Sequence, residues 1–404
     1  MSIDLEALYI DLHRHPELSF QETRTAGVIA RELAALGLEA TEGLGKTGVA
    51  TQIANGDGPV VWLRADMDGL PVAEQTGLPY ASTARGTDTS GTDVPVMHAC
   101  GHDMHVTALL GALEKLQNTK DEWSGTVVAV FQPAEEYGAG SQAMIRDGVL
   151  DRFPHPDIVL GQHLTPLPAG TIGVRPGTQM AASDGLTVTL LGRGGHGSRP
   201  HATIDPVVMA AATVMRLQTV VSREIDPREM AVVTVGSIHA GLKNNIIPAE
   251  ARLELSLRYP DDEAREDVMA RVERIVRAEA QASGATDEPV IVVDHSLPPT
   301  INDADATARL TAAWDRAFGE GTVVDPGMFT GSEDVSWFAR DAGVPLVFWF
   351  WGGLDPQQFA DAVARGTVNE DIPTNHSSFF APILHPTIER GVDALVVAAR
   401  EFLS

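Results

Sequence analysis

The sequence predicts an α/β protein with a main domain built on a doubly wound mixed sheet and a smaller α+β domain inserted into it. Three observations support this prediction. Continuous apolar runs, typical of buried parallel strands, alternate with helical patterns in the first part of the chain. From about residue 183 the strands alternate between apolar and polar residues, and after Pro298 and Pro299 the first pattern returns. A chain of 404 residues also exceeds what one hydrophobic core usually holds.

The main domain begins with two helices, predicted at residues 5–12 and 22–36, the second ending at Gly37. Buried strands are predicted at 60–65, 126–131 and 157–161, and a helix is predicted to begin near Asp103. Each of these strands is followed directly by polar side chains. Because ligands bind beyond the carboxyl ends of the strands in doubly wound sheets, we expect a functional site there.

The inserted domain is predicted from the element order β-α-β-β-α-β, which is that of a ferredoxin-like sandwich. Asp205 and Pro206 are typical of the first residues of a helix. The predicted elements are strand 186–191, helix 206–221, strands 231–238 and 251–258, helix 262–283 and strand 289–293. We therefore assign residues 183–295 to the insertion, and residues 1–182 and 296–404 to the main domain. The main domain resumes with a helix at 303–318, an apolar strand at 345–351 and a final helix at 386–402.

Composition excludes several classes of partner. The formal net charge of −26 disfavours binding to nucleic acids or anionic membranes. A single cysteine excludes an intrachain disulfide, so the fold needs no oxidising compartment. The first residues lack the pattern of a secretory signal, and no apolar run reaches the length of a membrane span. We therefore expect a cytoplasmic protein.

The stretch from Met97 to His105 concentrates metal-binding side chains. It holds three histidines, an aspartate and Cys100, the only cysteine of the chain, one glycine away from His102. Thiolate and neutral imidazole are the ligands that a borderline-soft divalent metal prefers. A solvated histidine-rich loop would explain this stretch in isolation, but further ligand types follow at later strand ends.

Adjacent carboxylates, Glu135 and Glu136, follow the strand at 126–131. Because successive side chains at a strand end point in opposite directions, one can face a metal and the other a bound water. His163 and His376 complete a set of five predicted ligands: Cys100, His102, Glu136, His163 and His376. Five protein ligands exceed the need of one tetrahedral ion, whereas two ions about 3.5–4 Å apart would account for them.

Four separated motifs resemble the signature of the N-acyl-amino-acid amidohydrolase and hippurate hydrolase family. That family is a branch of the dinuclear metallopeptidases that include aminoacylase and glutamate carboxypeptidase. The motifs span nearly the whole chain in the right order. They are residues 97–103 (MHACGHD), 132–136 (QPAEE), 195–201 (GHGSRPH) and 375–377 (NHS).

The resemblance implies that the five predicted ligands bind two divalent ions and that Glu135 is the general base. It implies that His196 stabilises the tetrahedral intermediate, in related enzymes from the partner subunit. Asn245 and Arg258 match positions that hold the substrate's carboxylate. Ser332 lies in a loop that resembles the family's substrate-side loop, although a helix N-cap explains that loop equally well. The inserted domain is expected to act as a lid and to form a homodimer or a higher homo-oligomer.

The implied activity is the hydrolysis of the amide bond of a small N-acyl amino acid. Mixed sulfur, nitrogen and oxygen ligands favour zinc or manganese and also permit cobalt or nickel. The same machinery would serve a dipeptidase, an N-acetyl-diaminopimelate deacetylase or an auxin-conjugate hydrolase. The same residues would also suit a single-zinc hydrolase or a catalytically silent metal-binding scaffold.

One departure from the wider superfamily concerns Asp66 and Asp68. Other branches carry a histidine ligand where Asp66 stands. Here Cys100 and His102 look like the substitutes. We expect Asp68 to support catalysis by orienting a histidine.

Overall fold

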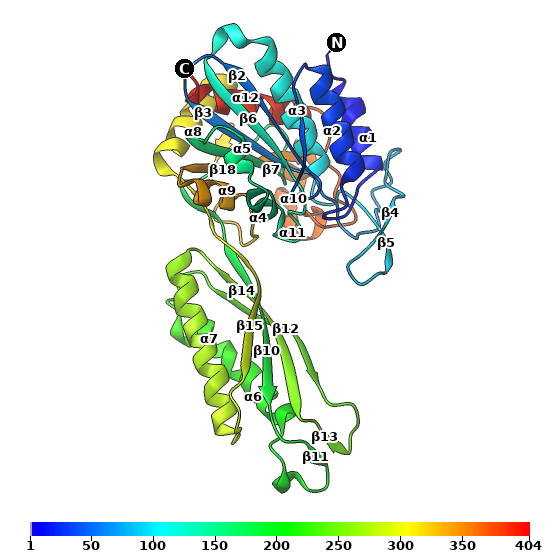
Figure 1. Cartoon of the computed structure of the whole chain (residues 1–404), viewed down its shortest axis with the longest axis vertical. Helices are drawn as coiled ribbons and strands as arrows, with labels where there is room; N and C mark the ends of the chain where they lie inside the picture. The colour runs from blue at the N-terminus through cyan, green and yellow to red at the C-terminus, as the bar shows by residue number, and fades with distance from the viewer. Residues whose placement is uncertain (1) are drawn as a thin grey trace. The chain divides into compact units, whose positions relative to one another are not determined.

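The computed structural model describes residues 2–404, which divide into two compact units (Figure 1). Unit 1 contains the residues up to Gln179, Ile301–Met328 and Asp334–Ser404, and unit 2 contains Met180–Thr300 and Phe329–Glu333. The limits predicted at 182/183 and 295/296 lie a few residues away. The segment 329–333 belongs to unit 2, because the backbone N–H of Ala181 donates to the carbonyls of Phe329 and Gly331, at 3.0 Å each.

Unit 1 is built on an eight-stranded sheet in the order β1-β2-β6-β3-β7-β18-β8-β17. Its centre is parallel, because β3 pairs in parallel with β6 and β7, and β7 with β18. The hairpin β1–β2 pairs antiparallel with β6, which makes the sheet mixed and confirms the predicted fold class. The strands are β1 Thr41–Leu44, β2 Gly48–Asn55, β3 Val60–Asp66, β6 Gly125–Gln132, β7 Ile158–Pro168, β8 Ile172–Gly173, β17 Val323–Val324 and β18 Leu346–Leu354.

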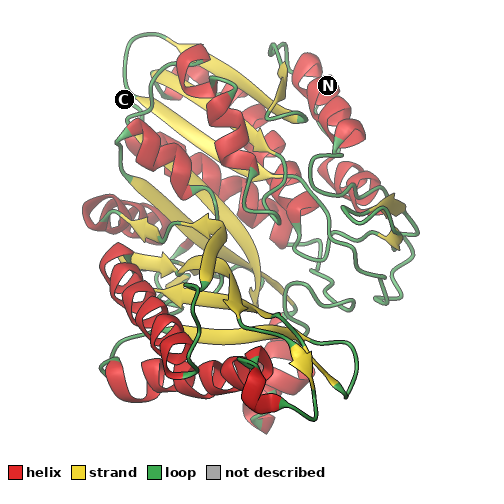
Figure 2. Cartoon of the chain, turned by 60° about the horizontal axis from the view of Figure 1, so that its bottom comes forward, coloured by secondary structure: helices red, strands yellow, loops and turns green. Residues whose placement is uncertain are grey.

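Helices cover both faces of this sheet (Figure 2). Strand β3 alternates between the two faces: Leu63 packs in the core formed with helix α3, whereas the Trp62 ring lies 6.2 Å from the Phe338 ring of α9. Fully burying a side chain such as Leu63 stabilises the fold by about 1.5–3 kcal/mol. The helices of unit 1 are α1 Leu5–Arg14, α2 Thr23–Ala35, α3 His102–Asn118, α4 Gly140–Arg146, α5 Val149–Arg152, α8 Ala304–Phe318, α9 Ser336–Ala342, α10 Pro356–Arg365, α11 Val368–Asp371 and α12 Thr387–Phe402.

Unit 2 is a four-stranded antiparallel sheet in the order β12-β14-β10-β15, with helices α6 and α7 on one face. Leu253 and Leu255 of β14 alternate with exposed residues and pack with Met209 of α6 and Val272 of α7. This is the predicted ferredoxin-like order. The bounds are β10 Ala182–Leu191, α6 Pro206–Thr219, β12 Val232–Ala240, β14 Glu250–Tyr259, α7 Asp262–Ala282 and β15 Val290–Leu297.

Short elements connect this framework. They are β4 Arg85–Thr87, β5 Asp93–Pro95, β9 Gly177–Met180, β11 Gly195–His196, β13 Ile246–Ile247 and β16 Thr300–Asn302. The hairpin β1–β2 and these short strands were not predicted. Apart from β2, they are only two to four residues long, which is too short to show the alternation that marks a strand. Within residues 2–404 we find no helix with the length and apolar character needed to span a membrane.

Candidate metal centre

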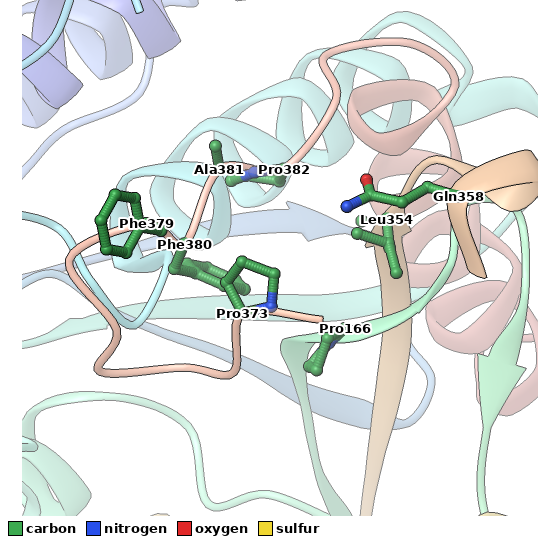
Figure 3. A pocket seen from close by; sticks show the side chains of 9 residues that line it. Pro166, Leu354, Gln358, Pro373, Phe379, Phe380, Ala381 and Pro382 are labelled. Carbon is green, nitrogen blue, oxygen red and sulfur yellow. The ribbon is translucent and has the colours of Figure 1, made fainter. Parts of the chain in front are cut away.

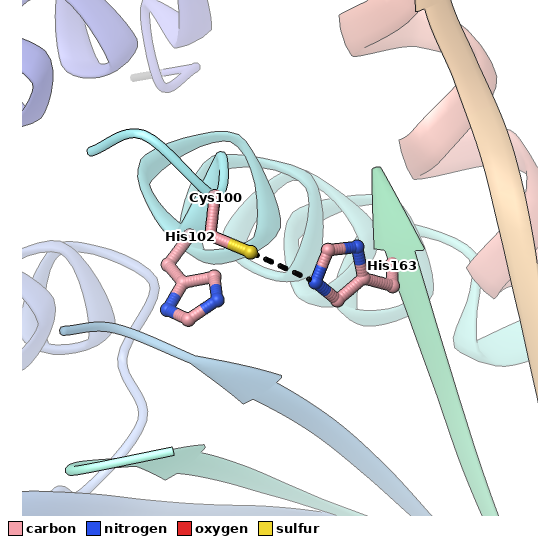
Figure 4. Close-up of side chains that lie close together, drawn as sticks. All are labelled: Cys100, His102 and His163. Atoms are coloured by element: carbon pink, nitrogen blue, oxygen red, sulfur yellow. Dashed lines mark hydrogen bonds between the residues drawn. The ribbon is translucent and has the colours of Figure 1, made fainter. Parts of the chain in front are cut away.

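The five predicted ligands lie together at the carboxyl end of the parallel strands of unit 1. Ligand atoms of Cys100, His102 and His163 all lie within 4.8 Å of one another, as do those of Cys100, Glu136 and His376. Figure 4 shows the first group, in which the Cys100 thiol points toward the His163 ring. Because Cys100 belongs to both groups, the two sets of ligands adjoin.

The turn between Cys100 and His102 depends on glycine. Gly101 has φ +84° and stands directly before helix α3, and the ligand atoms of both flanking residues reach the same cluster. A Cβ atom at this position would lie 2.9 Å from Cδ2 of Leu164. Both the positive φ and the lack of space therefore require glycine here.

His163 lies inside a strand rather than after one, which corrects the predicted end of the strand at residue 161. Strand β7 continues to Pro168 because its backbone pairs with β18, with His163 opposite Phe350. Its pairing with β3, however, stops at Gly161. The His163 Nδ1 donates to the Leu164 carbonyl at 2.7 Å, which leaves Nε2 directed at Cys100 Sγ, 3.4 Å away.

His102 also presents its Nε2 atom to the cluster. Its Nδ1 lies 3.2 Å from Oδ1 of Asp68, so this carboxylate accepts the Nδ1 proton and orients the ring. The Nε2 atom has no hydrogen-bond partner, although it is buried, and lies 3.9 Å from Glu136 Oε1 and 4.0 Å from Glu135 Oε2. Burial by itself would lower the pKa of His102, but the charges of Asp66 and Asp68 raise it to about 10.

These observations fit a cation at the cluster. A buried imidazole nitrogen and a buried oxygen of Glu136 lack hydrogen-bond partners, which is costly unless another species satisfies them. Burial raises the pKa of the Cys100 thiol, and the charges of Glu136 and Glu135 raise it further. The neighbouring carboxylates make the surroundings of the cluster negative. A divalent metal bound by its sulfur, nitrogen and oxygen atoms would offset this charge.

Two buried carboxylates hold the backbone that carries Glu135 and Glu136. The N–H groups of Glu135 and Glu136 donate to the two oxygens of Asp68, at 3.2 and 3.1 Å. The preceding N–H, of Ala134, donates to Glu22 Oε1 at 2.8 Å, and Ala134 itself has φ +48°. The Asp68 carboxylate therefore both orients the His102 ring and fixes the backbone of Glu135 and Glu136. The contribution of Glu22 was not predicted, since its sequence context is that of an ordinary helix start.

Asp66 is committed elsewhere, although it lies within ligand distance of His102 and His105. Its Oδ2 accepts a hydrogen bond from Arg64 Nη1 at 2.6 Å, and its Oδ1 one from His105 Nδ1. The His105 Nε2 in turn accepts from the Leu164 N–H at 2.9 Å, so both ring nitrogens are used. Asp66 and His105 therefore tie β3 and α3 to the strand that carries His163.

Arg64 is a buried cation that was not predicted from the sequence. It also donates to Oδ1 of Asp334 at 3.1 Å and, from Nε, to Gln132 at 2.8 Å. An arginine near the end of the apolar run 60–65 was the available signal. Helix α9 begins at Ser336, with Val335 as its N-cap.

His376, in the loop between α11 and α12, completes the cluster. It has φ +71°, and its Nε2 lies 3.4 Å from Glu136 Oε1. Its N–H donates to the Ala99 carbonyl at 2.8 Å, and the Asn375 amide donates to the Cys100 carbonyl at 3.2 Å. These bonds hold the two ligand-bearing loops together.

A second buried hydrogen-bond network joins helix α1 to helix α3. His13 Nδ1 lies 2.7 Å from Asp103 Oδ2, and its Nε2 lies 3.2 Å from Glu74 Oε1. Burial by itself would lower the pKa of His13, but the hydrogen bonds to Asp103 and Glu74 raise it to about 9. Both ring nitrogens of His13 are therefore used in contacts that join α1 to other parts of unit 1.

This pairing predicts a pH-dependent stability. Since the pKa of His13 is higher in the folded than in the unfolded chain, its contribution is full below about pH 6.5 and is lost as pH rises through 9. We expect the free energy of unfolding to fall by about 3 kcal/mol over this window relative to His13→Gln. Urea unfolding from pH 6 to 9.5 checks this. His15→Gln, at a half-exposed neighbour, should keep the wild-type slope, and an equal slope in His13→Gln would contradict the prediction.

The four candidates of unit 2 form two pairs. His196 and Asn245 lie beside each other at the antiparallel pair of strands β11 and β13, where the Gly197 N–H donates to the Asn245 carbonyl at 2.8 Å. Arg258 Nη1 donates to Ser332 Oγ at 2.7 Å. Strand β14 separates the pairs, because Asn245 precedes its first residue and Arg258 lies near its last. At about 3.3 Å per residue, this strand places the pairs roughly 25 Å apart.

Comparisons with known proteins agree on one family. The profile of Peptidase family M20/M25/M40 matches residues 62–380. The N-acetyl-L-cysteine deacetylase of Bacillus subtilis is 39% identical over 84% of this chain and 78% of its own length. The hippurate hydrolase of Campylobacter jejuni is 37% identical over 78% of this chain and 80% of its own. The crystal structure of the Bacillus subtilis YXEP protein, described as a dinuclear metal binding peptidase, superposes with a TM-score of 0.78 at 30% identity and covers 98% of both chains.

Proposed function

Since this chain belongs to Peptidase family M20/M25/M40, we propose that it hydrolyses the amide bond of N-acyl amino acids with two divalent ions per subunit. The observation that carries the proposal is the cluster of five ligands with Glu135 beside it. The names of the relatives, which include an N-acyl-L-amino acid amidohydrolase, support the substrate class. Zinc and manganese are the favoured ions, with cobalt and nickel also compatible with these ligands. We place the protein in the cytoplasm, a reducing compartment that suits a chain with one cysteine.

In the proposed reaction Glu135 moves the protons. Cys100, His102, Glu136, His163 and His376 would hold the ions, which polarise the acyl carbonyl and lower the pKa of a water molecule when bound. Glu135 accepts a proton as the water oxygen bonds to the carbonyl carbon. It then delivers the proton to the amide nitrogen as the C–N bond breaks, which yields a carboxylic acid and a free amino acid. Asp68 keeps Glu135 in position through the backbone bond described above.

We further propose that the protein is a homodimer joined through unit 2 and that His196 serves the partner's site. The wide separation of the His196 and Arg258 pairs within unit 2 supports this, because one substrate cannot touch both pairs of the same subunit. Exposed apolar side chains on α6 and on the edge strand β12, such as Met215 and Ile238, support an interface there. In this arrangement His196 of one subunit donates to the oxyanion at the other subunit's site. There the substrate's carboxylate is bound by the Asn245 beside that His196 and by the Arg258 of the other subunit.

Light scattering should therefore give the mass of two chains. Mixing Glu135→Gln with His196→Asn chains, followed by subunit exchange, should regain activity that neither parent has. A single-chain mass, or no gain on mixing, would contradict the dimer or the shared site.

The function itself is tested by metal content and by turnover. We expect two ions per chain and release of free amino acid from N-acetyl or N-benzoyl amino acids, stopped by a chelator and restored by metal. A dipeptide series separates a dipeptidase from an acylase. One ion per chain would indicate a single-zinc hydrolase, and no turnover after metal loading would favour a silent scaffold.

A further inference from the structure

A cavity of about 150 Å³ lies in unit 1 (Figure 3). Most of the side chains that line it are apolar. They include Pro166, Leu354, Pro373, Phe379, Phe380 and Pro382. The only lining side chain with a polar group is Gln358, and no lining residue carries a charge. Phe379 is 53% exposed, so the cavity reaches the protein surface at this residue.

The walls of this cavity continue directly into the segments that hold the candidate ligands. Phe379 and Phe380 follow His376 in the same loop, and Pro166 follows His163 in strand β7. Phe380 Cε1 lies 3.4 Å from the place of a Cβ on Gly101, the residue between Cys100 and His102. The same segments therefore carry both the walls of the cavity and the candidate ligands His163 and His376.

We propose that this cavity binds the apolar acyl group of the substrate and that a group the size of a phenyl ring fills it. This inference rests on the proposed function. An apolar cavity of about 150 Å³ is large enough for benzene. The uncharged walls cannot pair with the carboxylate at the amino-acid end of the substrate, so that end must lie elsewhere. Each methylene buried in the cavity contributes about 0.8 kcal/mol, which is about fourfold in kcat/KM.

The first test is a series of N-acetyl, N-butyryl, N-hexanoyl and N-benzoyl derivatives of one amino acid, using the metal-loaded full chain. We expect kcat/KM to rise along the series and to be at least about tenfold higher for N-benzoyl than for N-acetyl. Phe379→Ala should lower this benzoyl-to-acetyl ratio about tenfold, because it removes an aromatic wall at the mouth. Val363→Ala is the matched control, since Val363 is 54% exposed and lies outside the cavity.

Leu354→Trp fills the cavity from the inside and should lower the same ratio. Because Leu354 is buried, this variant can misfold, and Phe379→Ala then decides alone. An unchanged ratio in Phe379→Ala, or a wild-type enzyme without preference for the larger acyl groups, would overturn the proposal.

Binding separates this inference from the proposed function. Calorimetry with the metal-loaded Glu135→Gln chain should show N-benzoyl bound at least about tenfold more tightly than N-acetyl, with the difference reduced by Phe379→Ala. Selective binding without turnover in the wild type would sink the hydrolase proposal and leave the acyl site standing. Turnover without selective binding would sink the acyl site alone.

Discussion

Replacing Glu135 with Gln should abolish turnover while the chain keeps its metal. The variant preserves the size of the side chain and the backbone bond to Asp68, but it cannot accept a proton. Because general acid–base catalysis contributes about 10²–10⁴-fold, we expect kcat to fall by at least that factor. Steady-state kinetics, with metal content measured on the same samples, checks this result.

Glu136→Gln provides the matched control next to Glu135. It replaces the oxygen that lies near His102 and His376, so we expect a loss of bound metal as well as of activity. If Glu135→Gln retained activity, or lost its metal as Glu136→Gln is expected to, the assignment of Glu135 as the base would be wrong.

Replacing Arg64 with Met should destabilise unit 1 by about 3–5 kcal/mol, because two buried carboxylates lose the cation that they share. In the native protein burial opposes ionisation of Asp66, but Arg64 together with His102 and His105 keeps its pKa well below the usual value. Without Arg64 this pKa rises, so the deficit in stability should shrink as pH falls from 7.5 toward 5. Urea unfolding at the two pH values, followed by a probe in unit 1, tests both statements.

Arg265→Met is the control for this experiment. Arg265 also pairs with a buried carboxylate, Asp184, at 2.6 Å, but its own side chain is one-third exposed. Water can therefore reach the remaining charge, and we expect a smaller loss of stability. If both variants lost the same free energy of unfolding, burial of the arginine would not be the cause of the large loss expected for Arg64→Met.

Much of the candidate centre could be predicted from the sequence, for a physical reason. The carboxyl ends of parallel strands meet at one edge of a sheet, so the polar residues after the runs 60–65 and 126–131 had to lie close together. Cys100 and His102 could be singled out because their chemical types and spacing are those of metal ligands. The ferredoxin-like unit followed from an element order, which is a local property of the chain.

Other features became visible only in the folded chain. Nothing in the sequence near Arg64 indicates Asp334, its partner 270 residues away. The bond between Glu22 and the Ala134 N–H likewise joins segments more than a hundred residues apart. Such polar pairs have no period, and a single hydrogen bond leaves no pattern in the neighbouring residues.

The sequence by itself therefore determined the fold class, the two kinds of sheet and the set of candidate metal ligands. Each of these can be seen in short stretches of the chain, as the spacing of apolar residues or the chemical type of a side chain. Only the tertiary structure decided that His163 lies inside β7 and that Asp66 is bound by Arg64 and His105. It also decided that Asp68 holds both His102 and the glutamate backbone. These outcomes depend on which buried donors and acceptors meet once separate segments pack, and packing is a property of the whole chain.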